Sequence, residues 1–355
     1  MDYNRVVNYI ESSFLHDLLM DEDVTDISYN GANIYYLHNE YGRKESDIQI
    51  SSNDVRDFIR QIANITEKQF SYQNPILDVT AGKYRINAVH PSIARNNEEP
   101  VIAFALRVAS IVPRITNESA FLTPYLIVLF QTLLKCGLSM VIGGMTGCGK
   151  TEFQKYLIRE MPSMTRIIII DNVLELSLNP VIKRMDINIW QADERNNNAN
   201  IQLLVKNALR SNPDWLIVAE SRGDEMVEIL NSAMTGHPII TTIHAYNAQS
   251  MSYRLARMVM MNDKRSSYEE ILRDINHHFP FYIYLKRKIT KQGQVKRFIE
   301  SIVFNDINQQ SYLIYEFKNG KHLYYRFPES ALNLVGEVDD EVFNKIFGRS
   351  KNETA

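Results

Sequence analysis

Between residues 139 and 160 the sequence predicts an apolar strand, then a glycine-rich loop, then a helix. Gly144 to Thr151 reads GMTGCGKT and fits the phosphate-binding pattern G-x-x-x-x-G-K-[ST]. Glycines allow backbone N–H groups to point inward at phosphate oxygens, and the dipole of the following helix adds positive potential there. This feature constrains the local fold to strand, loop and helix, and it constrains the ligand to a nucleotide.

Two side chains of this loop carry its chemistry. Lys150 can reach the β- and γ-phosphates of ATP, and the Thr151 hydroxyl can be a ligand of Mg²⁺. Cys148 is expected to contribute its backbone rather than a redox function. A glycine-rich loop that only resembles the motif is the alternative, which the matching strand and helix disfavour. The residues predicted to bind the nucleotide here are Gly144, Met145, Thr146, Gly147, Cys148, Gly149, Lys150, Thr151 and Glu152.

From Tyr125 onward apolar strands alternate with amphipathic helices, which indicates a parallel sheet. After Ala248 we expect helices and then two hairpins, which turn near Gln292-Gly293 and at Asn319-Gly320. The expected parallel strands are Ser139–Ile142, Arg166–Ile170, Asp186–Trp190, Trp215–Ala219 and Ile239–Ile243.

The first hundred residues predict a separate mixed α/β domain. Residues 1–19 are expected to form one amphipathic helix, and Asp54–Ile65 a second helix. A hairpin closed by Asn30-Gly31 should join strands Val24–Tyr29 and Asn33–His38. Further strands are expected at Ile76–Val79, Tyr84–Val89 and Val101–Val108.

Composition changes between Ile111 and Pro124, where IVPRITNESAFLTP contains two prolines, several turn formers and no periodicity. We therefore expect an N-terminal domain over 1–111 and a linker over 112–124. The second domain would cover 125–340, and the polar residues 341–355 would be a frayed tail.

Acidic residues follow two of the predicted parallel strands. Glu220 follows the strand that ends at Ala219, and Asp171 and Glu175 follow the strand that ends at Ile170. Ligands of open α/β sheets bind at the carboxyl ends of strands, and phosphoryl transfer needs acids that hold Mg²⁺ and orient water. We expect these acids to flank the phosphate loop, with Thr151 and Glu220 binding the metal. Solvated strand ends are the alternative.

Composition excludes some other classes. The 39 Lys and Arg against 42 Asp and Glu give a net charge of −3, which argues against a general nucleic-acid binder. The two cysteines, Cys136 and Cys148, do not make a zinc site. The most apolar stretch, Leu122 to Leu134, is interrupted by Pro124 and is shorter than the ~20 apolar residues of a membrane span.

Four segments together resemble the motifs of the type II/type IV secretion ATPases, also called traffic ATPases, in order and in spacing. They are the P-loop GGMTGCGKT, the Asp box IIIIDNVLEL, the Walker B segment ALRSNPDWLIVAESRG and the His box TGHPIITTIHA. Upstream, residues 74–92 and FALR are similar to the family's N-terminal domain, so the resemblance covers most of the chain. Within the family the chain resembles the Tad-pilus (CpaF-like) and VirB-type branch, because it has no four-cysteine zinc insert.

The resemblance implies roles for individual acids and histidines. Glu175 would polarise the attacking water, and Glu220 would be the Walker B acid. His237 and His244 would lie near the γ-phosphate. His237 follows Gly236 after a predicted helix, so helix capping is an alternative explanation for that pair.

Four arginines also match family positions. The resemblance implies that Arg210 and Arg222 flank Walker B, and that Arg85 and Arg107 close over the phosphates from the N-terminal domain. Such arginines would stabilise charge in the transition state, some of them from an adjacent protomer. A lone arginine is more often a solvated surface charge. The run Lys286-Arg287-Lys288 is interpreted as an exposed hairpin face rather than a nucleic-acid or lipid site.

The chain departs from the family pattern in three of these motifs. The usual Glu-Asp pair of the Asp box is Asp171-Asn172, the usual Gly before the Walker B acid is Ala219, and Tyr246 replaces the Asn after the His box. No main catalytic group is lost, but the role of Asp171 stays open.

We therefore expect the α/β class: an N-terminal α/β (PAS-like) domain, then a RecA-like P-loop domain with a mostly parallel sheet. The resemblance implies Mg²⁺-dependent ATP hydrolysis by a homo-hexameric ring at the cytoplasmic face of the membrane, with membrane-embedded platform proteins as partners and no direct nucleic acid or zinc. A RecA-like nucleic-acid translocase and a non-hydrolysing nucleotide-binding scaffold are the alternatives.

Overall fold

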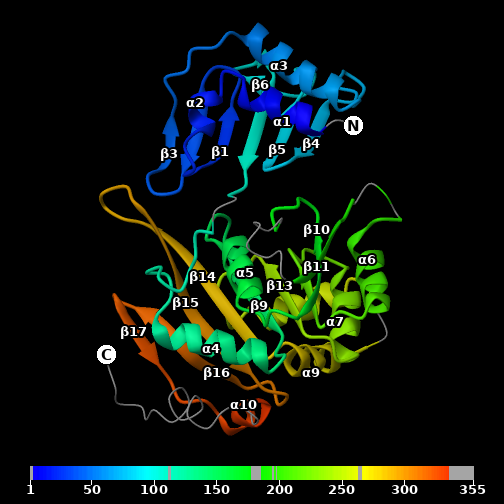
Figure 1. Ribbon diagram of the computed structural model, residues 1–355, viewed down its shortest axis with the longest axis vertical. Coiled ribbons are helices and arrows are strands. Elements are labelled where there is room, and N and C mark those ends of the chain that lie inside the picture. Colours follow the sequence, from blue (N-terminus) through cyan, green and yellow to red (C-terminus); the bar gives the residue numbers. More distant parts are fainter. Residues whose placement is uncertain are drawn as a thin grey trace. The chain divides into compact units, whose positions relative to one another are not determined.

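The computed structural model describes residues 3–110, 113–176, 185–193, 196, 198–262 and 266–335 (Figure 1). The chain divides into two compact units. The first contains Met1–Val112 and Lys288–Lys296, and the second contains Pro113–Arg287 and Arg297–Ala355. The predicted frayed tail, 341–355, lies outside the described residues.

The first unit is built on a six-stranded antiparallel sheet in the order β3-β2-β1-β8-β5-β4. Its helices are α1 (Tyr3–Glu11), α2 (His16–Leu19) and α3 (Ser52–Ile65). Its strands are β1 (Val24–Tyr29), β2 (Ile34–His38), β3 (Gly42–Glu45), β4 (Ile76–Ala81), β5 (Tyr84–Val89) and β8 (Ala103–Val108), beside the short pair β6 (Arg95–Asn96) and β7 (Glu99–Pro100). The hairpin predicted at Asn30-Gly31 is confirmed, and the strands predicted at Ile76–Val79 and Tyr84–Val89 form an antiparallel pair, β4 and β5.

The N-terminal amphipathic helix is shorter than predicted. It ends at Glu11, and a second, four-residue helix begins at His16. Between them the hydroxyl of Ser13 donates to the Ile10 carbonyl and accepts the Leu15 N–H. Serine side chains that bond nearby backbone groups compete with helical hydrogen bonds, which explains the break.

The second unit contains a nine-stranded mixed sheet in the order β11-β10-β12-β13-β9-β14-β15-β16-β17. The first six strands of this order run parallel, so the predicted mostly parallel sheet is confirmed. They are β9 (Met140–Gly144), β10 (Arg166–Asp171), β11 (Asp186–Gln191), β12 (Trp215–Val218), β13 (Ile239–Ile243) and β14 (Phe281–Ile289). The remaining strands, with antiparallel pairs β15–β16 and β16–β17, are β15 (Val295–Asn305), β16 (Ser311–Lys318) and β17 (Lys321–Tyr324).

Two apolar cores cover the two faces of this sheet. Side chains of a strand alternate between faces, so Ile167 and Ile169 of β10 pack into one core and Ile168 and Ile170 into the other. The first core includes α4 (Pro124–Lys135), α5 (Lys150–Arg159) and α10 (Glu329–Leu334). The second includes α6 (Ile201–Ala208), α7 (Met226–Met234), α8 (Met251–Val259) and α9 (Tyr268–His278).

The strand order corrects one expectation about the acids. Strands β12 and β10 neighbour each other, and β13 separates them from the P-loop strand β9. The acids that follow β10 and β12 therefore lie on one side of the loop and do not flank it. All these strands are parallel, so their carboxyl ends still share one edge of the sheet.

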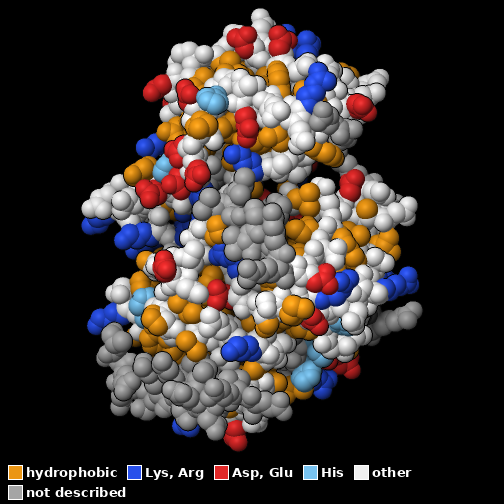
Figure 2. All heavy atoms as spheres, in the orientation of Figure 1, with side chains coloured by type: hydrophobic (Ala, Val, Ile, Leu, Met, Phe, Trp, Pro, Cys, Tyr) orange, Lys and Arg blue, Asp and Glu red, His pale blue; other side chains and the backbone are white. Residues whose placement is uncertain are grey.

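The described surface is mixed in charge. Figure 2 shows acidic and basic side chains interspersed over the face that it presents. Among the described residues, no helix is both long enough and apolar enough to cross a membrane.

Candidate functional site

The phosphate loop connects β9 to α5 and depends on its glycines. Gly147 and Gly149 have φ angles of 74° and 99°, a left-handed conformation that favours glycine. A Cβ at Gly144 would lie 2.5 Å from both Cys148 Sγ and the Leu285 carbonyl oxygen. The loop therefore needs glycine for its backbone conformation and for its contact with the neighbouring strand β14.

The lysine and the cysteine of the loop point to different surroundings. Lys150 Nζ donates to the carbonyl oxygen of Gly144 at 2.9 Å, so the ammonium group lies over the loop. Cys148 is fully buried, and burial raises the pKa of its thiol. A protonated, inaccessible thiol agrees with the prediction that Cys148 serves through its backbone.

The Asp box brings one acid to the loop and uses the other as scaffold. Glu175 Oε2 lies 3.5 Å from Thr151 Oγ1, across the junction of the loop and α5. Asp171 is only 2% exposed and accepts N–H groups from Val173 and Leu176 at 2.9 and 3.0 Å. Burial raises the pKa of Asp171, and these two donors oppose that rise. Asp171 thus shapes the turn that carries Glu175.

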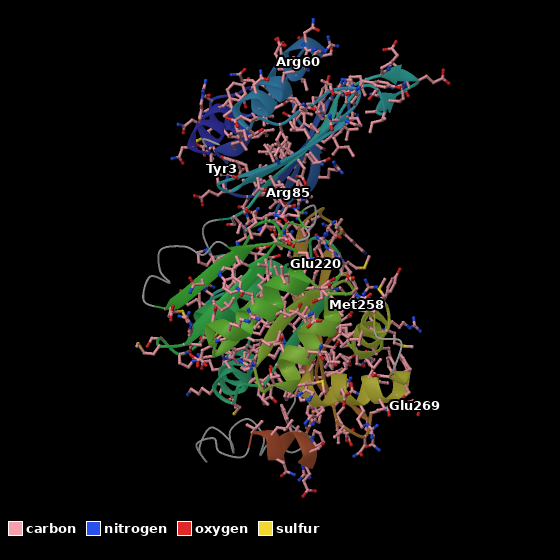
Figure 3. The ribbon with its side chains drawn as sticks, turned by 90° about the vertical axis from the view of Figure 1, so that its right-hand side faces the viewer. Tyr3, Arg60, Arg85, Glu220, Met258 and Glu269 are labelled. Carbon is pink, nitrogen blue, oxygen red and sulfur yellow. The ribbon has the colours of Figure 1, made fainter. Side chains whose placement is uncertain are left out.

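Glu220 follows β12 at the same edge (Figure 3). Its two carboxylate oxygens lie beside Arg222 and His244. Its Oε2 accepts from Arg222 Nε and Nη2 at 2.9 and 2.7 Å. Its Oε1 lies 2.9 Å from His244 Nε2, but the alignment is not that of a hydrogen bond, and Oε1 is a buried acceptor without a donor. Burial, followed by the positive charge of Lys150, lowers the pKa of His244, so the ring is neutral at pH 7.

These oxygens fit a magnesium ion. Mg²⁺ prefers hydroxyl and carboxylate oxygens with phosphate and water as further ligands. Thr151 Oγ1 and the buried, undonated Oε1 of Glu220 are of this type. Glu175 adds a carboxylate beside Thr151. The donor set of this edge therefore matches the cofactor expected with ATP.

Comparison with known proteins agrees with the sequence motifs and with the geometry of the phosphate loop. Residues 122–277 match the family described as type II/IV secretion system protein. Residues 122–277 are therefore a type II/IV secretion system domain. The predicted traffic ATPase family is confirmed, and with it the enzyme class, an ATP hydrolase.

Individual relatives extend the similarity to different lengths. An uncharacterised protein of Bacillus anthracis is 27% identical over 364 residues, covering 96% of this chain and 78% of that protein. The type IV secretion system protein VirB11 of Brucella suis is 35% identical over 126 residues, which is 35% of each chain. The Legionella pneumophila ATPase DotB shares the fold, with a TM-score of 0.59 at 20% identity over 92% of this chain and 84% of that chain.

The two histidines of the His box lie at opposite ends of β13 in this secretion ATPase domain. Ile243 pairs with Gly143, so His244 lies level with the start of the P-loop. His237 precedes the strand at the other edge, where its Nδ1 lies 3.0 Å from the Thr235 hydroxyl. The expectation that both lie near the γ-phosphate is wrong for His237 within one chain, because a five-residue strand separates them. The helix-capping alternative fits that end, since Gly236 has a φ of 93°.

The Walker B arginines divide in the same way. Arg222 lies beside Glu220, whereas Arg210 is exposed on the 3-10 helix Leu209–Ser211 that precedes β12. Arg210 is therefore at the amino edge and cannot bind a nucleotide on the P-loop of its own chain. Any contact of Arg210 with nucleotide would involve a neighbouring copy.

Arg85 and Arg107 belong to the first unit and lie opposite each other on β5 and β8. Arg85 pairs with Asp78 at 3.0 Å and Arg107 with Asp26 at 3.2 Å. Each arginine thus has a carboxylate within its own sheet, and their contact with phosphates stays a prediction.

The outer loop residues and Glu152 are less constrained. Met145 and Thr146 are exposed, and Glu152 forms an ion pair with Lys155 at 2.9 Å on α5.

A cavity of about 860 Å³ opens beside Met145, Arg222 and His244 and extends along α8 to Arg254 and Met258. The carboxyl edge of the sheet therefore has a cavity next to His244 of the His box.

Sequence reasoning missed two arginines at the phosphate loop. Arg297 Nε donates to the Gly147 carbonyl at 2.8 Å, and Arg287 Nη1 lies 3.0 Å from where a Cβ of Gly147 would stand. Arg287 belongs to the Lys286-Arg287-Lys288 run that was interpreted as an exposed hairpin face. Only the pairing of β14 with β9 could have placed it at the loop.

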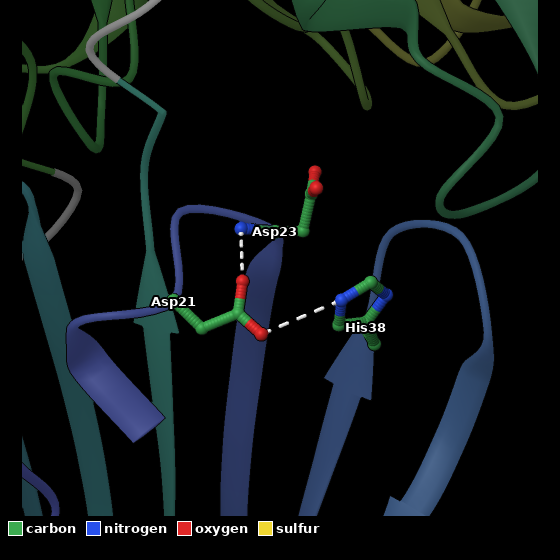
Figure 4. A group of neighbouring side chains, drawn as sticks. All are labelled: Asp21, Asp23 and His38. Atoms are coloured by element: carbon green, nitrogen blue, oxygen red, sulfur yellow. Dashed lines mark hydrogen bonds and ion pairs between the residues drawn. The ribbon is translucent and has the colours of Figure 1, made fainter. Parts of the chain in front are cut away.

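A second group of potential metal ligands lies in the first unit, where Asp21, Asp23 and His38 come together (Figure 4). His38 Nδ1 accepts the N–H groups of Glu40 and Tyr41 at 3.1 and 3.3 Å. The proton of the neutral ring is then on Nε2, which faces Asp21 at 3.4 Å. In this arrangement neither ring nitrogen of His38 offers a lone pair to a metal ion.

Proposed function

We propose that this chain is a Mg²⁺-dependent ATPase motor that works as a homo-oligomeric ring, a hexamer, at the cytoplasmic face of the membrane. It drives a type IV secretion or conjugation machine or a Tad-like pilus through membrane-embedded platform proteins. The observation that carries the proposal is the convergence of Lys150, Thr151, Glu175, Glu220 and His244 on one edge of the sheet.

The chain's own residues would divide the reaction as follows. The N–H groups of the loop and Lys150 bind and orient the triphosphate. Glu175 orients the water that attacks the γ-phosphorus, and Thr151 and Glu220 hold the ion. When bound, Mg²⁺ neutralises charge on the β- and γ-phosphate oxygens. Arg222 is held against Glu220 and is close enough to respond when that carboxylate binds the ion.

Neutral His244 suits a site that already contains Lys150 and Arg222. Burial and these two positive charges keep the pKa of the imidazole low, although Glu220 opposes them. A neutral ring can accept or donate a hydrogen bond to water or phosphate without adding charge. We infer that His244 reports the state of the γ-phosphate through its contact with Glu220.

The first unit would act with the motor domain. We infer that its six-stranded sheet, with α1 and α3 in the same core, is the PAS-like domain predicted from the sequence. Arg85 and Arg107 would leave their carboxylate partners to contact phosphates when nucleotide is bound. Arg210 would serve a neighbouring copy in the ring.

ATP turnover with Mg²⁺ tests the proposal directly. Glu175→Gln and Glu220→Gln are each expected to lower turnover by about 10²-fold or more, because each removes a group that acts on the attacking water or the metal. Glu160→Gln is the matched control, since that carboxylate pairs with Asn117 and Gln131 at the far end of α5. Equal, negligible rates in all four proteins would support a scaffold. Stimulation by DNA with steep salt dependence would support a translocase.

A further inference from the structure

Two arginines that no family motif assigns lie against the phosphate loop. Arg287 is on β14 and Arg297 on β15, the two strands of one hairpin. Arg297 Nε donates to the carbonyl oxygen of Gly147 at 2.8 Å. A Cβ at Gly147 would stand 3.0 Å from Arg287 Nη1, so both guanidinium groups approach the same loop residue.

The hairpin turn sets these arginines in register with each other. Thr290 N–H donates to the Gln294 carbonyl at 2.8 Å, and Arg287 and Arg297 are each three positions outside that pair (290 − 287 and 297 − 294). Opposed residues on antiparallel strands project to the same face, where like charges repel. The pair is therefore unfavourable without a nearby acceptor or anion.

In a second opposed arginine pair of the molecule, aspartates compensate the repulsion between the two positive charges. Arg85 and Arg107 also face each other across two strands, and each has its own aspartate. Among the described residues, no carboxylate forms an ion pair with Arg287. The neighbouring acid on the hairpin, Glu300, pairs with Lys286 instead. The Arg287 charge is thus left facing the loop that receives phosphates.

We propose that Arg287 and Arg297 form a clamp that holds the phosphate loop and sets its affinity for the diphosphate part of the nucleotide. This inference rests on the proposed function. Arg297 fixes the direction of the Gly147 carbonyl and therefore the plane of the peptide that joins Gly147 to Cys148 in the loop. Since loop N–H groups cradle the α- and β-phosphates, which ATP and ADP share, the clamp acts equally on both nucleotides.

The test is equilibrium binding of ADP and of ATP with Mg²⁺ to the full chain, together with steady-state turnover. Arg297→Ala is expected to raise both dissociation constants by about tenfold, because it removes one charge-assisted hydrogen bond to the loop. Arg287→Ala should raise them by a similar factor, because it removes a positive charge beside the loop. The KM for ATP should rise in step while kcat changes less than about twofold, as for uniform binding. Arg287→Lys should recover most of the affinity, because it keeps the charge.

Lys286→Ala is the matched control. It removes one positive charge from the adjacent position of β14, where the side chain projects to the other face and pairs with Glu300. Its dissociation constants should equal those of the wild type. Thermal unfolding without nucleotide checks that each variant folds. If Arg297→Ala does not fold, the comparison of Arg287→Ala with Arg287→Lys tests the clamp.

Several results would overturn the clamp. One is an affinity loss in Lys286→Ala as large as that in Arg287→Ala. Another is a fall in kcat of the arginine variants at unchanged nucleotide affinity. A third is an affinity loss in the arginine variants that affects ATP but not ADP. Wild-type affinity in both alanine variants would refute the clamp and leave the ATPase proposal standing. A wild-type chain that binds neither nucleotide would instead refute the ATPase proposal.

Discussion

The two edges of the parallel sheet in the second unit carry the same kinds of residue in very different surroundings. At the carboxyl edge, Arg222 and His244 both contact Glu220 beside the phosphate loop. At the amino edge, Arg210 is exposed and His237 forms a hydrogen bond with the nearby Thr235. Two motifs thus contribute one residue to each edge, because each motif contains a complete strand. Motif membership and spatial proximity are therefore different properties.

The largest expected effect is at the loop itself. Lys150→Ala should lower ATP turnover by about 10³-fold, since it removes the charge closest to the β- and γ-phosphates. Lys206→Ala is the control, because Lys206 pairs with Glu228 on the helices α6 and α7. Turnover assays with thermal unfolding measure both. Normal turnover by the Lys150 variant would show that this loop is not the ATP-binding site.

The arginines provide a sharper comparison between the edges. Arg222→Ala should lower turnover by about 10²-fold, because Glu220 loses both of its hydrogen-bond donors. Arg210→Ala should leave the ATP affinity of the dilute chain unchanged. Titration of nucleotide at low and high protein concentration measures both variants. A weaker ATP affinity of Arg210→Ala at low concentration would mean that the amino edge takes part in binding within one chain.

The histidines should differ in the same direction with a smaller effect. His244→Ala removes the ring next to Glu220 and should reduce turnover by about tenfold, the low end of effects of groups that contact the reacting region. His237→Ala should leave the turnover of the dilute chain within about twofold of wild type. Equal losses in the two variants, measured at saturating ATP, would contradict the division of the His box.

The smallest effect concerns pH and stability. The folded pKa of His244 lies below the ordinary 6.5, with burial as the main cause. As the pH falls through and below 6.5 the unfolded chain takes up a proton that the folded chain resists, so the free energy of unfolding decreases. Between pH 7.5 and 5.5 the wild type should lose slightly more stability than His244→Asn. Urea unfolding at both pH values measures this difference, and identical losses would show that burial of the ring does not govern its protonation.

Local pattern was sufficient for much of the fold. The Asn30-Gly31 hairpin, most strands of both sheets and the strand–loop–helix unit were predicted because turn residues and apolar periodicity are local properties. The edge strand β3 was not predicted. The break after Glu11 was missed because it depends on which backbone groups Ser13 bonds. The position of the acids relative to the loop was missed because strand order depends on long-range pairing, which no local sequence pattern predicts.

By itself the sequence determined the chemistry: a glycine loop with Lys150 and Thr151, and acids that end apolar strands. Glycine conformations and hydrogen-bonding groups are intrinsic to residue types, so they can be read without coordinates. Only the tertiary structure decided which charges meet there. Strand pairing brought His244 and Arg222 to Glu220, sent His237 and Arg210 to the opposite edge, and set Arg297 against Gly147 across 150 positions of chain. Electrostatic interactions depend on distance in space, and only the folded sheet fixes that distance.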